Sequence, residues 1–401
     1  MKDLFLLDPT IAFLNHGSFG ATPRAVFEEY QRIQRQFELN PVEYHGRRYN
    51  ELMREAREAL GRYVGADPLD LVFVTNATVA MNIVARSLEL GPGDVLLTTD
   101  HEYGACDRMW ELLRRERGFA IDRVEIPVPV TTHDDIVDRI TSRFSDHTKA
   151  LFISHITSPT AVRFPVERIC SEARSRGIIT IIDGAHAVGQ IPLDLGALGA
   201  DFYTSNLHKW LCAPKGSAFL HARRELQPTL KPLIASWGVD PIVDYDSTFI
   251  AHHEYRGTRE IAAPLSTAAA IAFQKEHDWE EVRHRCFEIV REARPLIAGR
   301  FGFEPIIPLE VPDPENWYTQ MSAFLLPEGI DAFAMKDRLY DEHRVEIPVF
   351  GWNGRSTIRL SVQGYNTWGD IERLVDALDA VGSARRADRS PQTRIKAARP
   401  E

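Results

Sequence analysis

Six short apolar runs, separated by segments of helical pattern, constrain the fold of this chain more than any other feature. The runs are LVFVT, VLLTT, ALFISHI, IITIID, DFYTSN and SAFLHA, at 71–75, 95–99, 150–156, 178–183, 201–206 and 217–222. Helical patterns lie between them, at 79–90, 103–117 and 166–176. Continuously apolar strands are buried on both faces, and alternation with helices is typical of parallel sheets. The pattern predicts an α/β fold whose large domain has a mostly parallel sheet covered by helices on both faces.

The pattern changes after about residue 260. A long helical region at 266–300 is followed by the strand SAFLLP, a helix at 331–343, the strand STIRLSV and a helix at 369–382. We therefore expect an N-terminal arm (1–30), a large domain (31–260), and an interdomain helix with a smaller α+β C-terminal domain (261–382). The polar, basic stretch 383–401 is predicted to be a disordered tail.

Charge and cysteine content exclude several classes of protein. The formal charge of −10, from 47 basic and 57 acidic side chains, disfavours a general attraction to nucleic acid or anionic membranes. The four cysteines lie far apart without a CxxC pair, which argues against a zinc site or a disulfide framework. No apolar stretch approaches the roughly 18 residues of a membrane span, and the N-terminus lacks a signal-peptide pattern. We expect a soluble cytoplasmic protein with no metal.

Two residues at the ends of neighbouring apolar runs could carry chemistry. Asp183 closes the run at 178–183, and Lys209 follows the next run. Open α/β sheets bind ligands at the carboxyl ends of their strands, so both side chains could lie at one site. Separately, Asp183 could be a helix N-cap and Lys209 a structural or surface lysine. Together they form the pair that pyridoxal 5′-phosphate (PLP) requires, a Schiff-base lysine and a carboxylate for the protonated ring nitrogen.

The stretch FVTNATVAMN, at 73–82, could hold a phosphate group. It is expected to form a strand, a tight junction and the start of a helix. Ala77 and Thr78 would then offer backbone N–H groups at a helix N-terminus, and Thr78 would add a hydroxyl group. Because Asn and Thr cap many helices that bind no ligand, this signal is weak by itself.

The ordered motifs TNATVAMN, DHEYGACDRMW, IIDGAHAVG, NLHKW and RLSVQGYNT make a stronger case together. They resemble the fold-type I PLP-dependent enzymes of the class V aminotransferase family, which includes the cysteine desulfurases. The isopenicillin N epimerase-like branch of that family is the most similar pattern. The resemblance covers roughly residues 10–380. It implies an aspartate aminotransferase-like fold, PLP as cofactor, and an amino acid or amino-acid-derived substrate.

The resemblance implies catalytic roles for Lys209, Asp183 and His186. Lys209 is similar to the lysine that forms the Schiff base with PLP, and Asp183 to the aspartate that pairs with the pyridine nitrogen. His186 matches the position that hydrogen-bonds the phenolic oxygen of the cofactor. Tyr103 would stack on the pyridine face, and His101 is the alternative if the register of that motif differs.

The resemblance also implies the residues that bind the phosphate group. Ala77, Thr78, Asn206 and His208 look like phosphate ligands, although Asn206 stands where the desulfurases commonly have serine. Thr258, in YRGTRE, resembles a residue on a loop that crosses a dimer interface to the cofactor phosphate of the partner chain. We therefore expect a homodimer with shared active sites.

The expected substrate contacts lie near the two ends of the chain. Arg359, in TIRLSV, is similar to the arginine that binds the substrate α-carboxylate, for which a planar guanidinium is suited. An exposed charge on an alternating strand is the plainer interpretation of Arg359. Asn15 and His16, in LNHGSFG, are candidate contacts from the N-terminal arm. Trp237, Phe350 and Trp352 could belong to the pocket or to the core, and the core is favoured for any one of them.

The reaction is less constrained than the cofactor. The stretch DEHRVEIPVFGWNGRSTIR contains no cysteine where a cysteine desulfurase carries its nucleophilic thiol. The leading expectation is chemistry at the Cα of an amino acid through an external aldimine, of epimerase or racemase type. A C–S lyase reaction by β-elimination is nearly as well supported, and transamination comes third. A non-catalytic cofactor-binding protein is the alternative of another class, whereas a nicotinamide-dependent enzyme is disfavoured because no GxGxxG follows the first strand.

Overall fold

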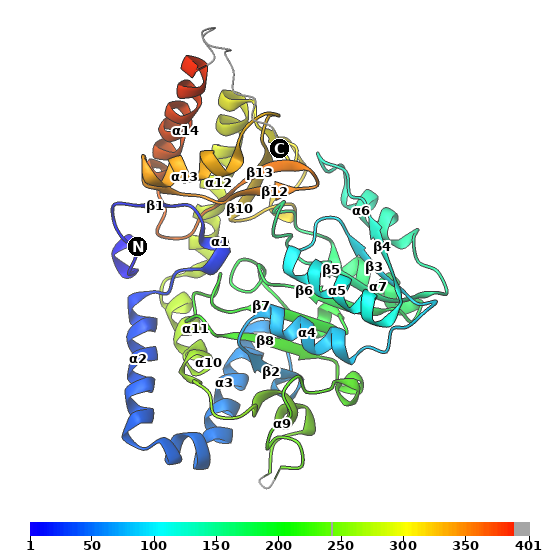
Figure 1. Cartoon of the computed structure of the whole chain (residues 1–401). Helices are drawn as coiled ribbons and strands as arrows, with labels where there is room; N and C mark the ends of the chain where they lie inside the picture. Colours follow the sequence, from blue (N-terminus) through cyan, green and yellow to red (C-terminus); the bar gives the residue numbers. More distant parts are fainter. Residues whose placement is uncertain (242–243, 389–401) are drawn as a thin grey trace, which may run out of the picture.

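The computed structural model describes residues 1–241 and 244–388, apart from the side chains of 382–388 (Figure 1). Its central feature is a seven-stranded sheet with the order β2-β8-β7-β6-β5-β3-β4. The strands are β2 (Leu71–Val74), β3 (Val95–Thr99), β4 (Ala120–Val124), β5 (Thr148–Ser154), β6 (Ile179–Asp183), β7 (Phe202–Asn206) and β8 (Ala218–Ala222). Strand β8 runs antiparallel to the other six strands of this sheet. The predicted mostly parallel sheet is confirmed, and all six predicted strands belong to it.

Strand β4 is the strand that the apolar pattern missed. It lies at one edge of the sheet, and only its last residue, Val124, is buried. An edge strand covered on one side does not need a continuous apolar run, so its sequence, AIDRV, resembles a loop or a surface helix. The missing signal therefore reflects the position of β4 in the sheet.

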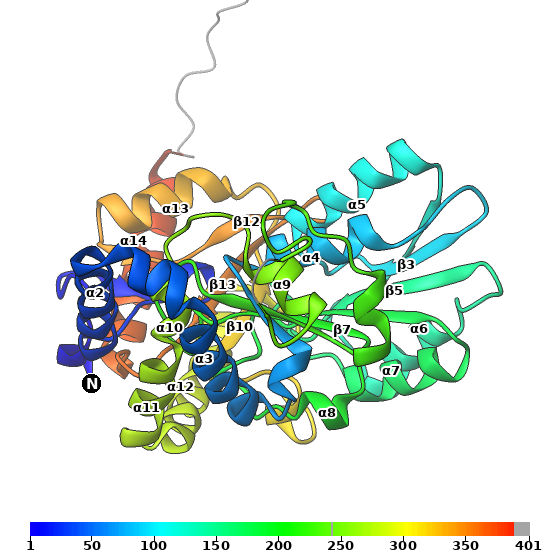
Figure 2. The ribbon, with the colours of Figure 1, turned by 90° about the horizontal axis from the view of Figure 1, so that it is seen from below.

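Helices cover both faces of this sheet (Figure 2). One layer contains α4 (Ala77–Ser87), α5 (Gly104–Arg117) and α9 (Thr248–Glu254), and the other contains α3 (Tyr49–Val64), α6 (His133–Thr141), α7 (Val166–Ser175) and α8 (Leu195–Leu198). Neighbouring residues of one strand enter different apolar clusters: Ile181 packs with the first layer and Ile182 with the second. The two-sided burial explains why the inner strands have consecutive apolar residues instead of an alternating pattern.

The C-terminal part forms a second, antiparallel sheet with the order β12-β13-β10-β9. Its strands are β9 (Glu304–Pro305), β10 (Met321–Leu325), β12 (Val349–Trp352) and β13 (Arg355–Ser361), and its helices are α12 (Trp279–Phe301), α13 (Ala332–Asp341) and α14 (Trp368–Asp388). Both predicted strands, SAFLLP and STIRLSV, are central to this sheet. Helix α14 continues to Asp388, and residues 389–401 of the predicted tail lie outside the described residues.

The predicted long helix at 266–300 is divided in the structure. Helices α10 (Ala262–Leu265) and α11 (Thr267–Glu276) precede α12, and the chain turns at Asp278, whose φ of 47° is left-handed. A helix cannot continue through that conformation. The break turns α12 toward the C-terminal sheet, whereas α11 packs on α2 and α3.

The N-terminal arm connects the two parts of the chain. Its short strand β1 (Ala12–Phe13) pairs with β11 (Val345–Glu346), and helix α1 (His16–Phe19) follows directly. Helix α2 (Arg24–Leu39) then leads to α3 (Figure 1). Among the described residues, no helix has both the length and the apolar character needed to cross a bilayer. The predicted boundaries at 30, 260 and 382 stay predictions.

Candidate functional site

The carboxyl ends of β6 and β7 and the N-terminus of α4 surround a cavity of about 390 Å³, here named the lysine cavity. Parallel β-strands bring residues that follow successive strands to one edge, as expected for Asp183 and Lys209. Eight predicted site residues line the lysine cavity: Ala77, Thr78, Tyr103, Asp183, His186, Asn206, His208 and Lys209. The sequence motifs are therefore brought together in space.

Asp183 is the last residue of β6 and is only 3% exposed. Its Oδ1 accepts a hydrogen bond from the Ala185 N–H at 2.9 Å, and its Oδ2 has a weak contact with the Cys106 thiol at 3.8 Å. Burial raises the pKa of the Asp183 carboxyl, while the positive charge of Lys209 acts in the opposite direction. A buried carboxylate with one incompletely bonded oxygen needs a cationic partner to stay ionised.

Lys209 lies in the turn that follows β7, and its Nζ is 3.1 Å from Nε2 of His186. Burial, and next the charge of Arg359, lower the pKa of the Lys209 amine to about 7. An amine with that pKa is largely deprotonated just above neutral pH. It can therefore act as a nucleophile or accept a proton under ordinary conditions.

The N-terminus of α4, where the sequence predicted a phosphate site, differs in detail from the prediction. The Ala77 N–H donates to Oδ1 of Asn206 at 2.9 Å, and the Val79 N–H donates to the Asn76 side chain at 2.9 Å. Neither the N–H nor the hydroxyl group of Thr78 takes part in the hydrogen bonds found among the described residues. Thr78 thus offers two free donors at the positive end of α4.

His208 also lines the lysine cavity, and its Nδ1 is 3.2 Å from the carbonyl oxygen of Ser217. Nδ1 therefore carries a proton, because a carbonyl oxygen can only accept. Burial lowers the pKa of His208 to about 4, so the free ring is neutral at pH 7. An anion at Nε2 would favour the protonated ring. The roles of Ala77, Asn206 and His208 toward phosphate stay predictions.

A second cavity, of about 470 Å³, adjoins the first and is here named the arginine cavity. Both cavities share Tyr103, Ser158 and Lys209, and Arg359 lines only the second. Nη1 of Arg359 donates to the Ser158 carbonyl oxygen at 2.6 Å, whereas the buried Nε has no hydrogen-bond partner. Burial lowers the pKa of Arg359 to about 10, which still leaves it charged at neutral pH. An unpaired edge of a buried guanidinium is suited to a carboxylate.

Aromatic side chains that sequence reasoning assigned to the core line the arginine cavity. Phe350 and Trp352 both contribute to its wall, together with Phe19 and Tyr103. The Trp352 indole donates to the Asp100 carbonyl oxygen at 2.9 Å, which connects the C-terminal sheet to the large sheet across this cavity. Core and pocket aromatics have the same sequence pattern, so only the fold distinguishes them.

The structure does not bring Asn15 and His16 to either cavity wall. His16 is fully buried, and its ring nitrogens lie 2.9 Å from the Tyr365 hydroxyl and 2.9 Å from the Lys209 carbonyl oxygen. Asn15 donates to Glu346 at 2.9 Å. Gly17, Ser18 and Phe19 line the arginine cavity instead. His16 thus holds the backbone of Lys209, and the arm reaches the site a few residues later than predicted.

Two further predictions concern His101 and Thr258. His101 is fully buried, with its ring nitrogens bonded to Thr160 at 2.7 Å and to the Ile126 carbonyl oxygen at 2.9 Å. Tyr103, by contrast, lines both cavities, so the register that places Tyr103 at the site agrees with the geometry. Thr258 is exposed and lines neither cavity. Its contact with a partner's cofactor stays a prediction.

Three residues at the site escaped the sequence reasoning. Ser158 holds Arg359, Cys106 contacts Asp183, and the Trp210 indole donates to His186. Trp210 directly follows Lys209, and Cys106 is in the first turn of α5, just after Tyr103. Spacing along a helix or turn could have indicated both residues, whereas nothing local to Ser158 reveals its partner.

The chemistry of the two cavities defines a class of enzyme. A pyridine ring held between Lys209 and Asp183 would receive a Schiff-base amine near its aldehyde and an anion at its nitrogen. The free donors of Thr78 lie at the same cavity and suit a phosphate group. The buried, incompletely bonded Asp183 and the unprotonated amine thus fit PLP, and the fold is that of the fold-type I PLP-dependent enzymes.

Comparison with known proteins specifies the family. The family model for class V aminotransferases matches residues 13–374. The isopenicillin N epimerase of Amycolatopsis lactamdurans is 35% identical over 93% of this chain and 95% of its own length, and that of Streptomyces clavuligerus is 36% identical over 94% and 96%. The rice protein named "Putative L-cysteine desulfhydrase 1" is 29% identical over 92% of this chain and 83% of its own length. This chain belongs to the class V aminotransferase family.

Solved structures agree on the fold. The cysteine desulfurase CsdA of Escherichia coli superposes with a TM-score of 0.79 at 20% identity, over 96% of this chain and 98% of CsdA. A C-DES mutant with glycine covalently linked to its PLP cofactor gives a TM-score of 0.80 at 17% identity, over 94% of this chain and 98% of C-DES. The cofactor of this family is PLP, as the sequence predicted.

Proposed function

We propose that this protein is a PLP-dependent epimerase or racemase that inverts the configuration at the Cα of an amino acid or of an amino-acid derivative. One observation carries the proposal: the amine of Lys209, whose pKa is lowered to about 7 by burial, borders the same cavity as the unpaired edge of Arg359. An amino acid anchored there would have its Cα–H within reach of a base. PLP, when bound, supplies the electron-accepting ring that makes this hydrogen acidic.

Lys209 is proposed to move the proton. With a pKa of about 7, its amine can take a proton from Cα near neutral pH. Inversion also requires a second group on the opposite face, which delivers a proton to Cα as the first proton stays on Lys209. Asp183 is proposed to hold a protonated ring nitrogen and Tyr103 to cover one ring face. Arg359 is proposed to bind the α-carboxylate by Nε and Nη2, while Ser158 holds Nη1.

Persulfide chemistry of the desulfurase type fits this chain poorly. All four cysteines, Cys106, Cys170, Cys212 and Cys286, are buried. Burial raises the pKa of each of these thiols, which keeps them protonated. No cysteine is therefore available as an exposed thiolate on a loop beside Arg359.

Two further observations support inversion over elimination. The isopenicillin N epimerases are more similar to this chain, at 35% and 36% identity, than the rice desulfhydrase, at 29%. The arginine cavity also extends beyond Arg359 to the aromatic side chains of Phe350 and Trp352. A cavity of about 470 Å³ has room for a side chain larger than that of cysteine.

A C–S lyase that performs β-elimination is the second candidate. The desulfhydrase relative and the desulfurase-like fold favour it. The same Lys209 amine would remove the Cα proton, and the β-substituent would leave instead of the proton returning. Transamination needs the same first step and a second, keto-acid substrate, and a non-catalytic cofactor-binding protein would perform none of these reactions.

A panel of amino acids and amino-acid derivatives, incubated with the PLP-loaded protein in deuterated buffer, distinguishes the candidates. Inversion should introduce deuterium at Cα and leave the molecule otherwise intact. Release of a keto acid and ammonia would instead identify the lyase, and amination of an added keto acid the transaminase. Absence of exchange with every compound would contradict catalysis at Cα.

We further propose a homodimer whose active sites are shared. Thr258 is exposed on its own chain, and the loop that carries it would contact the phosphate group in the partner's lysine cavity. Sedimentation at several protein concentrations tests the dimer. Mixed dimers that combine Thr258→Val in one chain with Lys209→Ala in the other test the sharing. A shared site predicts that one of the two lysine cavities then carries both defects and the other carries neither.

A further inference from the structure

A chain of three side chains leads from the protein core into the lysine cavity. The indole Nε1–H of Trp210 donates to Nδ1 of His186 at 3.2 Å, and Nε2 of His186 lies 3.1 Å from Nζ of Lys209. Trp210 is fully buried and His186 is 2% exposed. Both hydrogen-bond partners of the His186 ring are side chains of the protein, so the protein sets the orientation of the ring.

Trp210 is itself held firmly. Its carbonyl oxygen accepts a hydrogen bond from Nε2 of Gln274 at 2.9 Å, and the His16 ring packs on the indole with ring centroids 4.9 Å apart. A Cβ atom placed on Gly189 would lie only 2.4 Å from the Trp210 carbonyl group, so the backbones touch here. The indole therefore has little freedom to release His186.

The chemistry of the indole decides which His186 nitrogen carries the proton. An indole N–H can donate but cannot accept, so Nδ1 of His186 must present a lone pair. In a neutral imidazole the proton then lies on Nε2, the nitrogen that faces the lysine cavity. His186 is consequently a hydrogen-bond donor toward that cavity, and the Lys209 amine accepts from it.

We propose that Trp210 is a positioning residue that fixes His186 as the Nε2–H tautomer, so that His186 donates to the cofactor's phenolic oxygen and does not act as a base. The last part rests on the proposed position of that oxygen beside His186. It also follows that the base needed on the face opposite Lys209 is a different group.

The surroundings of His186 keep the ring neutral. Burial lowers the pKa of His186 well below its usual range, and the positive charge of Arg359 acts in the same direction. A protonated ring would carry a hydrogen on Nδ1 and lose the bond from Trp210. Because the ring stays neutral, the choice between its two tautomers is the property that Trp210 controls.

Nitrogen NMR of the cofactor-free protein labelled at its 14 histidines tests the tautomer directly. The His186 signals are those that vanish in the His186→Gln variant. We expect them to show a single tautomer with the proton on Nε2, and we expect Trp210→Phe to give a mixture of both tautomers. Trp110→Phe is the matched control, since Trp110 is 1% exposed and its indole nitrogen has no hydrogen-bond partner.

A proton on Nδ1 in the unmodified protein would overturn the proposal, even if Trp210→Phe failed to fold. An unchanged His186 spectrum in Trp210→Phe would overturn it as well. Neither measurement requires PLP, so both are independent of the proposed reaction.

The PLP-loaded protein tests the cofactor contact. Loss of a fixed donor to the phenolic oxygen should raise the pH midpoint of the cofactor's visible absorbance by about half a pH unit or more in Trp210→Phe. In a His186→Gln background the same substitution should add no shift, because an amide N–H₂ needs no tautomer control. A mixed tautomer without any absorbance shift would refute the cofactor contact, while the Trp210–His186 relationship would stand.

Discussion

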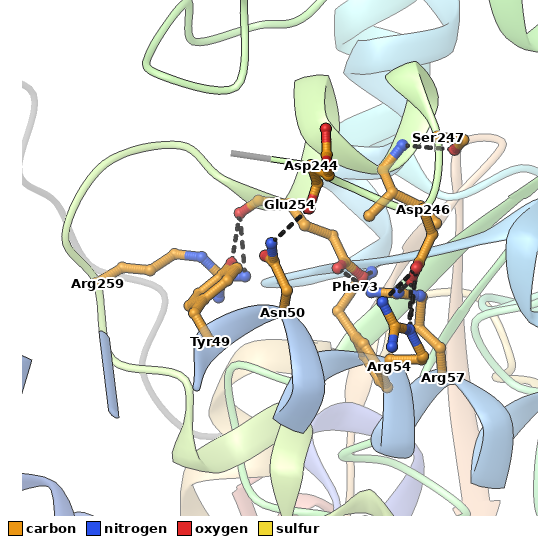
Figure 3. A network of polar contacts seen from close by, with 11 residues as sticks. Tyr49, Asn50, Arg54, Arg57, Phe73, Asp244, Asp246, Ser247, Glu254 and Arg259 are labelled. Atoms are coloured by element: carbon orange, nitrogen blue, oxygen red, sulfur yellow. Dashed lines mark hydrogen bonds and ion pairs between the residues drawn. The ribbon is translucent and has the colours of Figure 1, made fainter. Parts of the chain in front are cut away.

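Two clusters of charged side chains in the described part of the chain differ in how many of their polar atoms have partners within the protein. The Arg57 network consists of Arg54, Arg57, Asp246 and Glu254, which connect α3 to the segment around α9 (Figure 3). Glu254 accepts from Arg57 and from the Phe73 N–H at 2.9 Å, so both of its oxygens are used. Asp246 accepts from Arg57 at 2.6 Å and from Arg54.

The site at the two cavities shows the opposite arrangement. Nζ of Lys209 has one polar neighbour, Oδ2 of Asp183 has one weak contact, and Nε of Arg359 has none. Buried charge is stabilised only by its partners, so a network whose buried carboxylates are bonded without a ligand serves the fold. Buried charged groups that lack such partners around a cavity indicate that a bound ligand supplies them.

Lys209→Ala should produce the largest effect and should act on chemistry alone. Turnover should fall by about 10²–10⁴-fold or more because the group that moves the proton is gone. The free energy of unfolding should stay nearly unchanged or increase, since an open charge is removed. Borohydride should no longer attach the cofactor to the chain, as mass spectrometry would show.

Lys231→Ala is the control for this variant, because Lys231 is exposed and pairs only with Glu89 on the surface. A Lys209→Ala protein that retained normal turnover would contradict the contrast between the two regions.

Glu254→Gln should instead affect stability alone. Removing one partner of a buried ion pair costs about 3–5 kcal/mol of unfolding free energy, and the lower end is expected because Arg57 keeps Asp246. Urea denaturation would measure the loss. Glu29→Gln removes a more exposed pair with Arg32 and should change stability by no more than about 1 kcal/mol.

The folded fraction of Glu254→Gln should retain its cofactor spectrum and turnover. A variant that kept full stability but lost turnover would reverse the roles assigned to the two regions.

Arg359→Lys should have an intermediate effect, confined to ligand binding. A lysine cannot offer the planar pair of donors, so amino-acid affinity should fall by about tenfold to a hundredfold. Titration of the holoenzyme's visible spectrum with an amino acid would measure it. Arg355→Lys, on the same strand but paired with Glu304 at the surface, should leave the affinity unchanged. Equal losses in both variants would indicate a general effect on β13.

The pH dependence of stability should isolate the contribution of the Lys209 amine. The pKa of Lys209 is about 7 in the folded protein and 10.5 ordinarily, so between these values the unfolded chain binds more protons. The unfolding free energy of the cofactor-free protein should therefore rise with pH from about 7 to 10, by up to about 1.4 kcal/mol per pH unit from this group. Lys209→Met should remove this rise and Lys231→Met should not, as urea denaturation at several pH values would show.

Much of the fold followed from local patterns. The six apolar runs became strands β2, β3, β5, β6, β7 and β8, and the motifs after them supplied the wall of the lysine cavity. The exceptions have physical causes. Strand β4 is an edge strand with exposed positions. The helix predicted at 266–300 is interrupted where Asp278 takes a left-handed conformation. The hydrophobic periodicity of a sequence reveals neither the position of a strand at the edge of a sheet nor the backbone angle of a single residue.

The sequence by itself determined that Asp183 and Lys209 would meet, because each follows an apolar run and parallel strands align their carboxyl ends. Only the tertiary structure decided which polar atoms at that site have no hydrogen-bond partner within the protein. The Ala77 N–H is bonded by Asn206, both His16 nitrogens are occupied, and the Trp210 indole sets the proton on His186. These partners mostly come from distant elements, and a hydrogen bond depends on atomic distances that no local pattern of residues encodes.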